Sequence, residues 1–401
     1  MALPDILSPA FERDPYAFYK TLRDDHPFFY DEGTGSYVLS RYDDVVRALE
    51  SPAFSVRNYE HSYTPIHGRT ILQMDGREHA AYRNIIAHPL RPSNLRERFA
   101  KTIEDTTRAL IEAFRDRGQV DLVEAFTHHH ALRITTALLG LPDGDYPRVR
   151  AWATTFMVCF ADLTQDPELA DAGRRARAEL RAYLRPVIEE RRERPRDDLL
   201  STLCAASVDG VRLTDEEISA FCSLLIDASG DSPDKVLACL FKNLIERPAL
   251  LDQLREDRRL IEGALAETLR YSSPFQIVQR TTTEEVRLDV GIIPPNALVT
   301  CLLGAANRDE RRFESPDTFD IHRAENGTAR GSSPSARHLG FGHGRHVCVA
   351  ATLSKLEMQI ATDMLLDVMR DPRFTRGAPP PDEGLFVRGP RSLQISFTPP
   401  R

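Results

Sequence analysis

The side chains best suited to chemistry lie in one short segment, "HLGFGHGRHVCVAATL", residues 338 to 353. Cys348 stands there directly before a strongly helical pattern, and Gly342 and Gly344 allow the preceding backbone to turn tightly and approach a flat ligand. Free N–H groups and the helix dipole at such a position lower the pKa of a thiol. We therefore expect Cys348 to be a thiolate, either as a nucleophile partnered by His346 or as a ligand to a metal or haem.

The string "FGHGRHVC" resembles the cysteine-ligand loop of the cytochrome P-450 family, Phe-Gly-x-Gly-x-His/Arg-x-Cys-x-Gly, with Ala350 in place of the last glycine. The resemblance implies that Cys348 is the axial ligand of the iron of haem b, where a thiolate favours O–O cleavage. It also implies that Phe341 shields the sulfur and that His346 contacts a haem propionate.

Further segments match the family in the expected order. "MDGREHAAYRNII" carries His79 and Arg83 four residues apart, on one face of a helix, and Arg280 opens "RTTTEEVRL". By resemblance these three side chains bind the anionic haem propionates, for which guanidinium groups are well suited. With "AANRD" at residues 305 to 309, the resemblance extends from about residue 12 to residue 398.

A buried ion network is expected away from the haem chemistry. Glu267 and Arg270 lie three residues apart within an apolar helical pattern, so their side chains can meet, and a charge buried there needs a partner. The family supplies a second arginine from a Pro-x-x-Phe-x-x-x-Arg segment, here Pro316, Phe319 and Arg323. The resemblance implies a structural role for Glu267, Arg270 and Arg323 in folding and cofactor retention.

The family's central helix carries Ala/Gly-Gly-x-Asp/Glu-Thr, whose acid and alcohol relay protons to dioxygen. In "LLIDASGDSPDKV" the acid is Asp231 and the alcohol is Ser232, which retains a hydroxyl without the methyl group of threonine. We expect Asp231 and Ser232 to be catalytic. Pro233 removes an N–H group and Ser232 can donate to the carbonyl of Ala228, so we expect a kink in the helix at this point.

Asp227 is a charged residue where the family usually has an apolar one, on the flank of the helix that faces the substrate pocket. Two interpretations stay open. Asp227 pairs with an arginine of an overlying helix, or it accepts a hydrogen bond from a hydroxyl or amine of the substrate.

The family also indicates by position which residues line the substrate pocket. The set is mainly apolar with a few polar members, as is usual for small-molecule pockets. It comprises Tyr63, Ile66, Leu225, Asp227, Ala228, Phe275, Ile277, Val278 and Phe386.

The elements that position these residues follow from the apolar spacing. Helical periodicity extends over about 70 to 272 and 348 to 370, and strand-like alternation over about 35 to 60, 275 to 303 and 383 to 398. We expect a mainly α fold with a smaller β part (α+β), which the resemblance specifies as the cytochrome P-450 fold, a triangular helical body with small antiparallel sheets. Strands from both ends imply one domain over residues 1 to 401, with a loop-like insertion at 324 to 337.

The composition excludes several classes of protein. The chain is 41% hydrophobic and 28% charged with a net charge of −8, which is typical of a soluble globular protein and not of a nucleic-acid binder. Without a signal peptide or an apolar run long enough to cross a bilayer, we expect a cytoplasmic protein without a membrane partner. The cysteines lack Cys-x-x-Cys spacing, and the five other than Cys348 are expected to be small buried hydrophobes.

Two other clusters of polar residues are weaker candidates for functional sites. The three residues His128 to His130 are neighbours on a helix and point in different directions, so we expect no shared metal ion. An acidic electron donor has a plausible docking surface on Arg91, Arg96, Arg98 and Arg345. The resemblance implies a separate ferredoxin-type donor, and we expect a monomer.

The resulting hypothesis is a haem-thiolate monooxygenase that inserts one oxygen atom of O2 into a small apolar or aromatic molecule, as a tailoring step on a natural product. Three alternatives stay open. The first is a haem-thiolate enzyme that couples, desaturates, rearranges or uses peroxide, the second a non-catalytic haem sensor or carrier, and the third a cysteine hydrolase with Cys348 and His346. The sequence does not identify the substrate.

Overall fold

Helices make up most of the computed structural model, which describes residues 5–162, 166–208, 210–326 and 337–400. Many helices begin at a residue that suits a first turn: Thr214 and Glu217 form a capping box, and Pro92 and Pro248 start their helices. The described helices are α1 Pro9–Arg13, α2 Tyr16–Asp25, α3 Tyr42–Glu50, α4 Tyr59–Ser62, α5 Thr64–His67, α6 Gly76–Ala87, α7 Pro92–Glu112, α8 His128–Leu138, α9 Tyr146–Ala161, α10 Pro167–Glu193, α11 Leu199–Ala205, α12 Asp215–Gly230, α13 Ser232–Ile245, α14 Pro248–Glu256, α15 Ile261–Tyr271, α16 Leu303–Ala306 and α17 Ala351–Val368.

The strands form two main sheets and two hairpins within the described ranges. One sheet has the order β1-β2-β10-β7-β3, the other has the order β11-β12-β4, and β5-β6 and β8-β9 are the hairpins. The strands are β1 Phe28–Asp31, β2 Ser36–Leu39, β3 Phe54–Ser55, β4 Gln119–Asp121, β5 Ser207–Val208, β6 Val211–Arg212, β7 Ile277–Thr282, β8 Val286–Leu288, β9 Gly291–Ile293, β10 Leu298–Leu302, β11 Arg370–Phe374 and β12 Gln394–Thr398.

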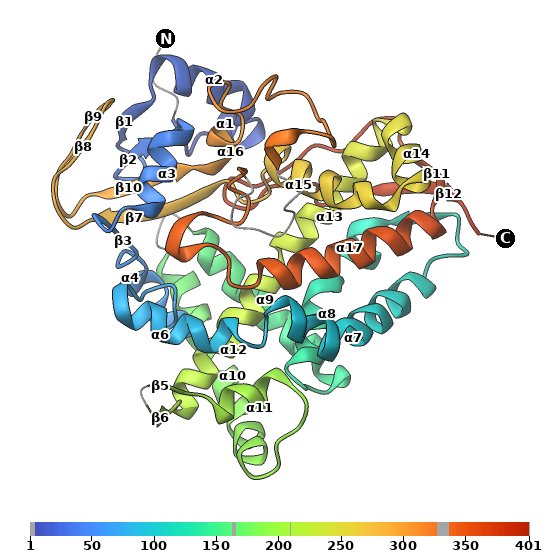
Figure 1. Ribbon diagram of the computed structural model, residues 1–401, viewed down its shortest axis with the longest axis horizontal. Coiled ribbons are helices and arrows are strands. Elements are labelled where there is room, and N and C mark those ends of the chain that lie inside the picture. Colours follow the sequence, from blue (N-terminus) through green and yellow to red (C-terminus); the bar gives the residue numbers. More distant parts are fainter. Residues whose placement is uncertain (1–4, 163–165, 209, 327–336, 401) are drawn as a thin grey trace.

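Both sheets join segments that are far apart in the sequence. In the first sheet β2 pairs in parallel with β10, so that Tyr37 lies opposite Val299. In the second, β12 pairs with β4, and Ile395 lies opposite Val120. Figure 1 shows the two sheets on opposite sides of the molecule with the helices between them. Each sheet therefore ties a late segment of the chain to an early one.

The fold class agrees with the expectation, but several strands differ from the predicted ranges. Strands β1, β4, β5, β6 and β11 lie outside those ranges, and within 383 to 398 the structure has a single regular strand, β12, with isolated bridges before it. Such two- to five-residue strands are hard to predict because pairing with other segments, more than local pattern, determines them. Residues 327–336, most of the predicted insertion, lie outside the described residues.

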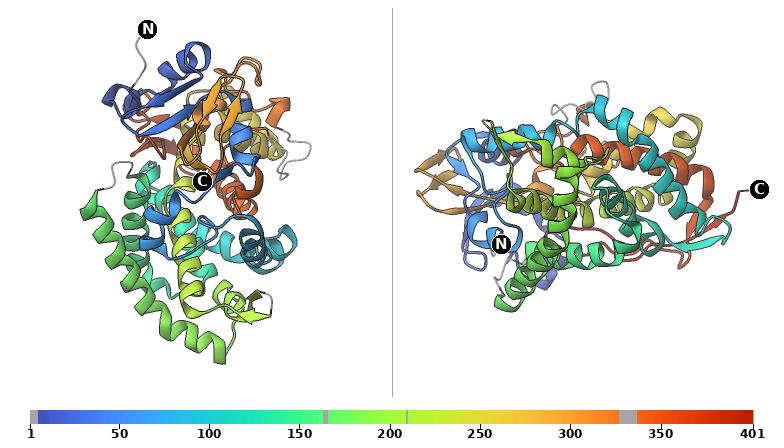
Figure 2. Two further views of the ribbon diagram at one scale, coloured as in Figure 1. Left: turned by 90° about the vertical axis from the view of Figure 1, so that its left-hand side faces the viewer. Right: turned by 90° about the horizontal axis from the view of Figure 1, so that it is seen from below.

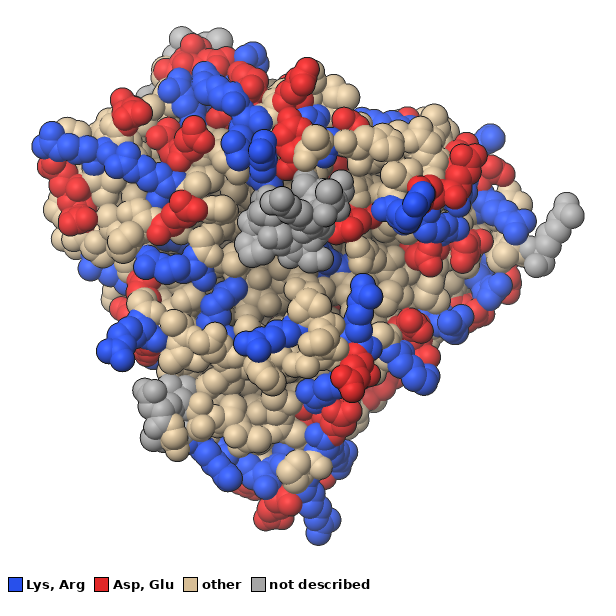
Figure 3. All heavy atoms as spheres, in the orientation of Figure 1, with Lys and Arg blue, Asp and Glu red and all other residues tan. Residues whose placement is uncertain are grey.

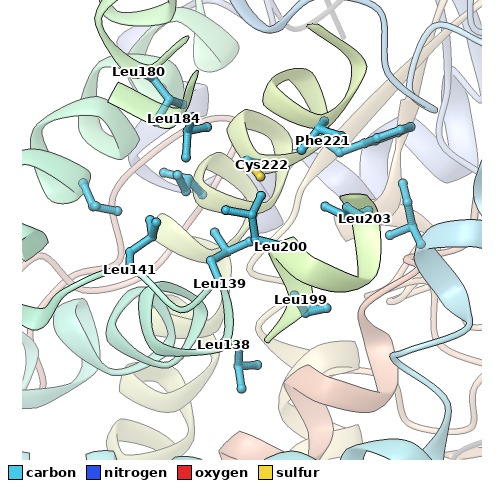
Figure 4. Packing of buried hydrophobic residues seen from close by; sticks show 14 of the residues in the cluster. Leu138, Leu139, Leu141, Leu180, Leu184, Leu199, Leu200, Leu203, Phe221 and Cys222 are labelled. Carbon is cyan, nitrogen blue, oxygen red and sulfur yellow. The ribbon is translucent and has the colours of Figure 1, made fainter. Parts of the chain in front are cut away.

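The largest hydrophobic cluster surrounds α12, which packs against α8, α9 and α10. Figure 4 shows Phe221 and Cys222 of α12 among leucines of α8, α10 and α11. Figure 2 shows this helical part at one end of the molecule and the five-stranded sheet at the other. Helix α12 thus runs through the helical body towards Asp231 and Ser232, the residues expected to relay protons. No helix in the described part of the chain is long and apolar enough to span a membrane.

Candidate functional site: a cysteine loop facing a broken helix

The loop before α17 is folded as its glycines predict. Gly342 and Gly344 have φ angles of 73° and 69°, in the left-handed region that favours glycine. The N–H of Cys348 donates to the carbonyl of Phe341 (2.8 Å) and closes the loop. A Cβ atom on Gly344 would lie 2.6 Å from the carbonyl oxygen of Leu49, so the loop packs tightly against the end of α3.

The Cys348 sulfur lies where the sequence predicts, just before α17, but its acidity differs from the expectation. The residue keeps solvent-accessible surface although protein surrounds it on most sides. Burial raises the pKa of the thiol, and this effect outweighs the N–H of Ala350 and the charge of Arg83, which lower it. The prediction that the helix terminus lowers the pKa of the Cys348 thiol is therefore wrong. A thiolate at this place needs a further positive charge to stabilise it.

The four residues predicted to bind propionates come together near this loop. The rings of His79 and His346 lie 4.1 Å apart between centroids, and the Nε2 atom of each is buried without a hydrogen-bond partner among the described residues. His346 Nε2 lies 3.5 Å from Asp75 Oδ1, beyond ordinary hydrogen-bond length. Arg280 is buried, and its Nη1 donates to the carbonyl of Gln279 (2.8 Å).

The electrostatics of this cluster favour an anion. Burial first, then the charges of His346 and Arg83, lower the pKa of His79 to about 4. Burial also lowers the pKa of His346, with Asp75 opposing and Arg280 and Arg345 adding to the effect. Donors and cations thus crowd together without matching acceptors. They fit a group with anionic substituents at its edge and an atom that a thiol can ligate, as haem has.

On the other side of the site, α12 is interrupted and not merely kinked. The helix ends at Gly230, Asp231 has φ −136° and ψ −43°, and α13 begins at Ser232 with Pro233 in its first turn. Proline is favoured in a first turn because its missing N–H is not needed there. Ser232 Oγ lies 3.4 Å from the carbonyl oxygen of Ala228, the contact expected from the sequence, and Ala228 is exposed.

Asp231 lies at this break with an altered acidity. Burial raises the pKa of its carboxyl group, while the ammonium group of Lys235 opposes the rise. Lys235 Nζ lies 3.8 Å from Asp231 Oδ1 and 3.1 Å from Asp234 Oδ2. A raised pKa favours the protonated form of the carboxyl group, the form that can donate a proton.

Asp227 has a partner that the sequence did not indicate. Its Oδ2 lies 3.3 Å from His67 Nε2, and His67 Nδ1 lies 2.8 Å from Ser223 Oγ. The predicted arginine partner is therefore wrong: α5 brings His67 to α12 and no arginine reaches this carboxylate among the described ion pairs. His67 lies twelve residues before His79, and its only sequence signal was a polar residue in the segment expected to line the pocket.

An aromatic cluster lies next to this pair and unites predicted pocket residues from distant segments. Tyr63 contacts Phe160 at 4.9 Å between ring centroids, and Phe160 contacts Phe386 at 4.4 Å. The ring centroids of Phe275 and Phe386 lie 5.0 Å apart. Phe160, at the end of α9, was not predicted because nothing in its helical pattern distinguishes it from a core residue. Ile66 is buried nearby in the main core, and Leu225 packs against it partly buried.

Two predicted pocket residues are neighbours on β7, and consecutive strand residues point to opposite faces. Val278 shares a face of the strand with Arg280. Ile277 lies on the other face and is fully buried in a cluster with Tyr19 of α2 and Phe386, another predicted pocket residue. A place for Ile277 in the pocket stays a prediction.

The predicted ion network is present and completely buried. Glu267 accepts hydrogen bonds from Arg270 Nε (2.8 Å) and Nη2 (2.7 Å) and from Arg323 Nε (3.2 Å). The remaining side-chain nitrogen of Arg270, Nη1, donates to the carbonyls of both Asn307 and Pro316. The network therefore joins α15 to the segment that follows α16.

The remaining predicted clusters are ordinary structural features. His130 is buried with Nε2 2.9 Å from Thr107 Oγ1, whereas His129 Nδ1 contacts the hydroxyl of Tyr146 (2.7 Å). Within the described ranges no cluster of His, Cys, Asp and Glu side chains is arranged to hold a metal ion. Arg98 pairs with Asp197 (2.8 Å), whereas Arg91, Arg96 and Arg345, the other members of the predicted docking surface, are exposed. Cys159 is half-buried and the other four cysteines are buried.

Comparison with known proteins agrees with this geometry. The cytochrome P-450 family model matches residues 149–397. Pulcherriminic acid synthase of Bacillus subtilis is 34% identical over 98% of this chain and 97% of its own length, and cyclomarin C epoxidase CymV of Salinispora arenicola is 33% identical over 97% and 98%.

Solved structures agree as well. CalO2 superposes with a TM-score of 0.87 at 27% identity over 99% of both chains, and HmtN, a post-tailoring hydroxylase of himastatin biosynthesis, superposes with 0.80 at 28% identity over 96% of this chain and 97% of its own. Together with the cysteine loop and the buried ion network, these matches show that the chain belongs to the cytochrome P-450 family, whose members are monooxygenases that bind haem b.

Proposed function

We propose that the chain is a haem-thiolate monooxygenase that inserts one oxygen atom of O2 into a small, mainly apolar or aromatic molecule in the biosynthesis of a natural product. The observation that carries the proposal is that Cys348 lies close to the cluster of His79, Arg83, Arg280 and His346. A thiol ligand for the iron and donors for the propionates are the two sets of groups that a haem site needs. The names of the relatives support the natural-product context, since one is named for the synthesis of pulcherriminic acid and the other for the epoxidation of cyclomarin C.

Each group of residues has a role in this proposal. When bound, haem supplies the activation of dioxygen with electrons from a donor. Cys348 would ligate the iron, whose positive charge would stabilise the thiolate against the burial that raises the pKa of the thiol. His79, Arg83, Arg280 and His346 hold the two propionates and so fix the orientation of the cofactor.

Asp231 and Ser232 are the proposed proton-handling groups. Burial raises the pKa of the Asp231 carboxyl group and so favours its protonated form, and Ser232 Oγ, at the start of α13, passes protons to the oxygen side. The aromatic cluster of Tyr63, Phe160 and Phe386 closes the opposite wall and excludes water from the substrate.

A second candidate function is a haem-thiolate oxidation that does not hydroxylate, such as coupling, desaturation or a peroxide-driven reaction. The complete break between α12 and α13, with serine in place of threonine, favours it because the alcohol is positioned by a new helix and not within a continuous one. Turnover in 18O-labelled dioxygen separates the two: one labelled oxygen in the product supports the monooxygenase, and an unlabelled product formed equally well with peroxide supports the alternative.

We also propose that electrons come from a separate ferredoxin-type donor. Figure 3 shows a face on which Lys and Arg side chains are scattered over an uncharged middle while most carboxylates lie towards its edges. Arg345 is exposed in the loop before α17 and would contact an acidic donor. Reduction by the donor should slow with rising ionic strength and in Arg345→Glu, and a rate independent of both would contradict this surface.

A further inference from the structure

A chain of buried polar side chains links α5 to α12 beside the aromatic cluster. Ser223 Oγ lies 2.8 Å from His67 Nδ1, and His67 Nε2 lies 3.3 Å from Asp227 Oδ2. All three residues are buried. If Ser223 donates to Nδ1, the N–H at Nε2 donates to Asp227, and one carboxylate oxygen is satisfied.

Two oxygens in this region have no hydrogen-bond partner among the described residues. They are Asp227 Oδ1 and the hydroxyl of Tyr63, and their side chains are only 4% exposed each. A buried carboxylate oxygen without a donor is costly in free energy, and so is a buried hydroxyl. The charged groups that affect this region are negative: Asp227 itself raises the pKa of Tyr63 and of Cys159 after burial. The fold therefore leaves acceptor capacity here that a donor from outside the chain can use.

The position of the two oxygens relates them to substrate. Asp227 precedes the exposed Ala228 by one position and follows the partly buried Leu225 by two. Tyr63 contacts His67 at 5.3 Å and Phe160 at 4.9 Å between ring centroids. The unpartnered oxygens thus lie where the aromatic wall meets the helix that leads to Asp231 and Ser232.

The segment that carries His67 and Tyr63 is held in place independently of Asp227. Arg177 of α10 donates to the carbonyl of Thr64 (2.8 Å) and pairs with Glu216 of α12. A Cβ on Gly68 would lie 3.1 Å from both Ala220 and Arg177, so the end of α5 packs closely on α12 and α10. Asp227 is consequently not required to fix α5, and its carboxylate is available for another role.

We propose that Asp227 Oδ1 and the Tyr63 hydroxyl form a polar anchor that selects substrates with an N–H or O–H hydrogen-bond donor. His67 orients Asp227 by donating to its other oxygen and acts as a positioning residue. The donor binds at the anchor, and the apolar or aromatic body lies against Phe160, Phe275 and Phe386. This inference deepens the proposed function and rests on it, since it names the chemical class of the substrate.

Optical titration of the ferric holoprotein tests the anchor without electrons or turnover. The probes are pairs that differ by one methyl group on the donor: 2-naphthol against 2-methoxynaphthalene, and indole against 1-methylindole. The donor-bearing member should bind about ten-fold more tightly or better, as expected for a hydrogen bond to a charged acceptor. Equal binding within both pairs, or no Soret shift with either donor-bearing probe, would overturn the proposal.

Variants separate recognition from a structural role. Asp227→Leu should bind both members of a pair equally, Tyr63→Phe should reduce the preference, and Asp215→Asn, at the exposed start of the same helix, should retain it. If Asp227→Leu does not hold haem, Asp227→Asn takes its place and should weaken the preference. An unchanged preference in both Asp227→Asn and Tyr63→Phe would contradict the anchor. Failure of the proposed function shows differently, as absence of oxidised product from bound donor probes while the preference persists.

Discussion

Glu267→Gln tests the buried ion network and should be among the most destabilising single changes in this chain. The carboxylate accepts from five donors, namely Arg270 Nε and Nη2, Arg323 Nε, Asn326 Nδ2 and the N–H of Asp320, at 2.7 to 3.2 Å. Glutamine has the same shape, but its NH2 group must face two of these donors. It also leaves two buried guanidinium groups without a counter-charge.

The magnitude follows from burial. Glu267 and Arg270 are both 0% exposed, so water cannot replace the lost acceptor. Removing one partner from a buried ion pair costs about 3–5 kcal/mol, a large part of the roughly 5–15 kcal/mol that stabilises a typical folded protein. The assay is urea unfolding of the holoprotein followed by tryptophan fluorescence and by Soret absorbance. Both transitions should shift to much lower urea concentration in Glu267→Gln.

A matched control is available in the same sequence spacing. Glu112 and Arg115 also form an i, i+3 ion pair (2.6 Å), but this pair is exposed to solvent. Exposed pairs contribute little because water and salt screen them, so Glu112→Gln should leave the unfolding midpoint almost unchanged. Equal, small shifts in the two variants would refute the reasoning that burial gives the Glu267 network its importance.

Three further predictions concern acid stability, proton delivery and cofactor retention. Burial lowers the pKa of His130 to about 3, so below pH 6.5 the unfolded chain binds a proton that the folded chain does not bind. The free energy of unfolding should therefore fall by about 2 kcal/mol from pH 8 to pH 5 through this group. The urea midpoints of His130→Phe should lack that part of the decline. Ser232→Ala should lower product formation by about 100-fold, the lower range for general acid–base groups, while substrate-induced Soret shifts stay unchanged; normal turnover would show that the Ser232 hydroxyl is dispensable. Arg280→Leu should release haem to apomyoglobin about ten-fold faster, because one charged hydrogen bond to a propionate is lost, and an unchanged rate would place Arg280 outside the cofactor site.

The cysteine loop and its partners were predictable because chemistry restricts their residue types. Few other residue types can replace the thiol at position 348, the glycines at 342 and 344, or the His79 and Arg83 pair in their roles. Their types and spacing are therefore recognisable in a single sequence. The ion network was predictable for the same reason: Glu267 within an apolar helical pattern needs Arg270 and Arg323.

Other features depend on distances that the sequence does not contain. His67 reaches Asp227 across 160 positions, and the local pattern of either segment gives no indication of that contact. The sequence located Cys348 correctly but not its raised pKa, because burial is a property of the whole fold and outweighs the local helix terminus. Ile277 and Val278 were both assigned to the pocket by position along the chain, whereas strand alternation directs them to opposite faces of β7.

The break between α12 and α13 could be predicted from the sequence only in part. Pro233 indicated a disturbance in the central helix, and the structure has one at that point. Local sequence could not distinguish a kink from a complete interruption, because the outcome depends on whether tertiary contacts hold the two halves in line. Asp234, which follows Pro233, is buried and accepts a hydrogen bond from Thr127 (2.5 Å), and this contact fixes the start of α13.

The central claim is that Cys348 ligates haem iron as a thiolate, and the difference spectrum of the reduced carbon monoxide complex tests it most directly. The wild-type chain should give the long-wavelength Soret band of thiolate ligation. Cys348→Ser should lose that band, whereas Cys159→Ser, a half-buried cysteine outside the loop, should retain it. A wild-type protein without the band, or a Cys348→Ser variant that keeps it, would contradict the account.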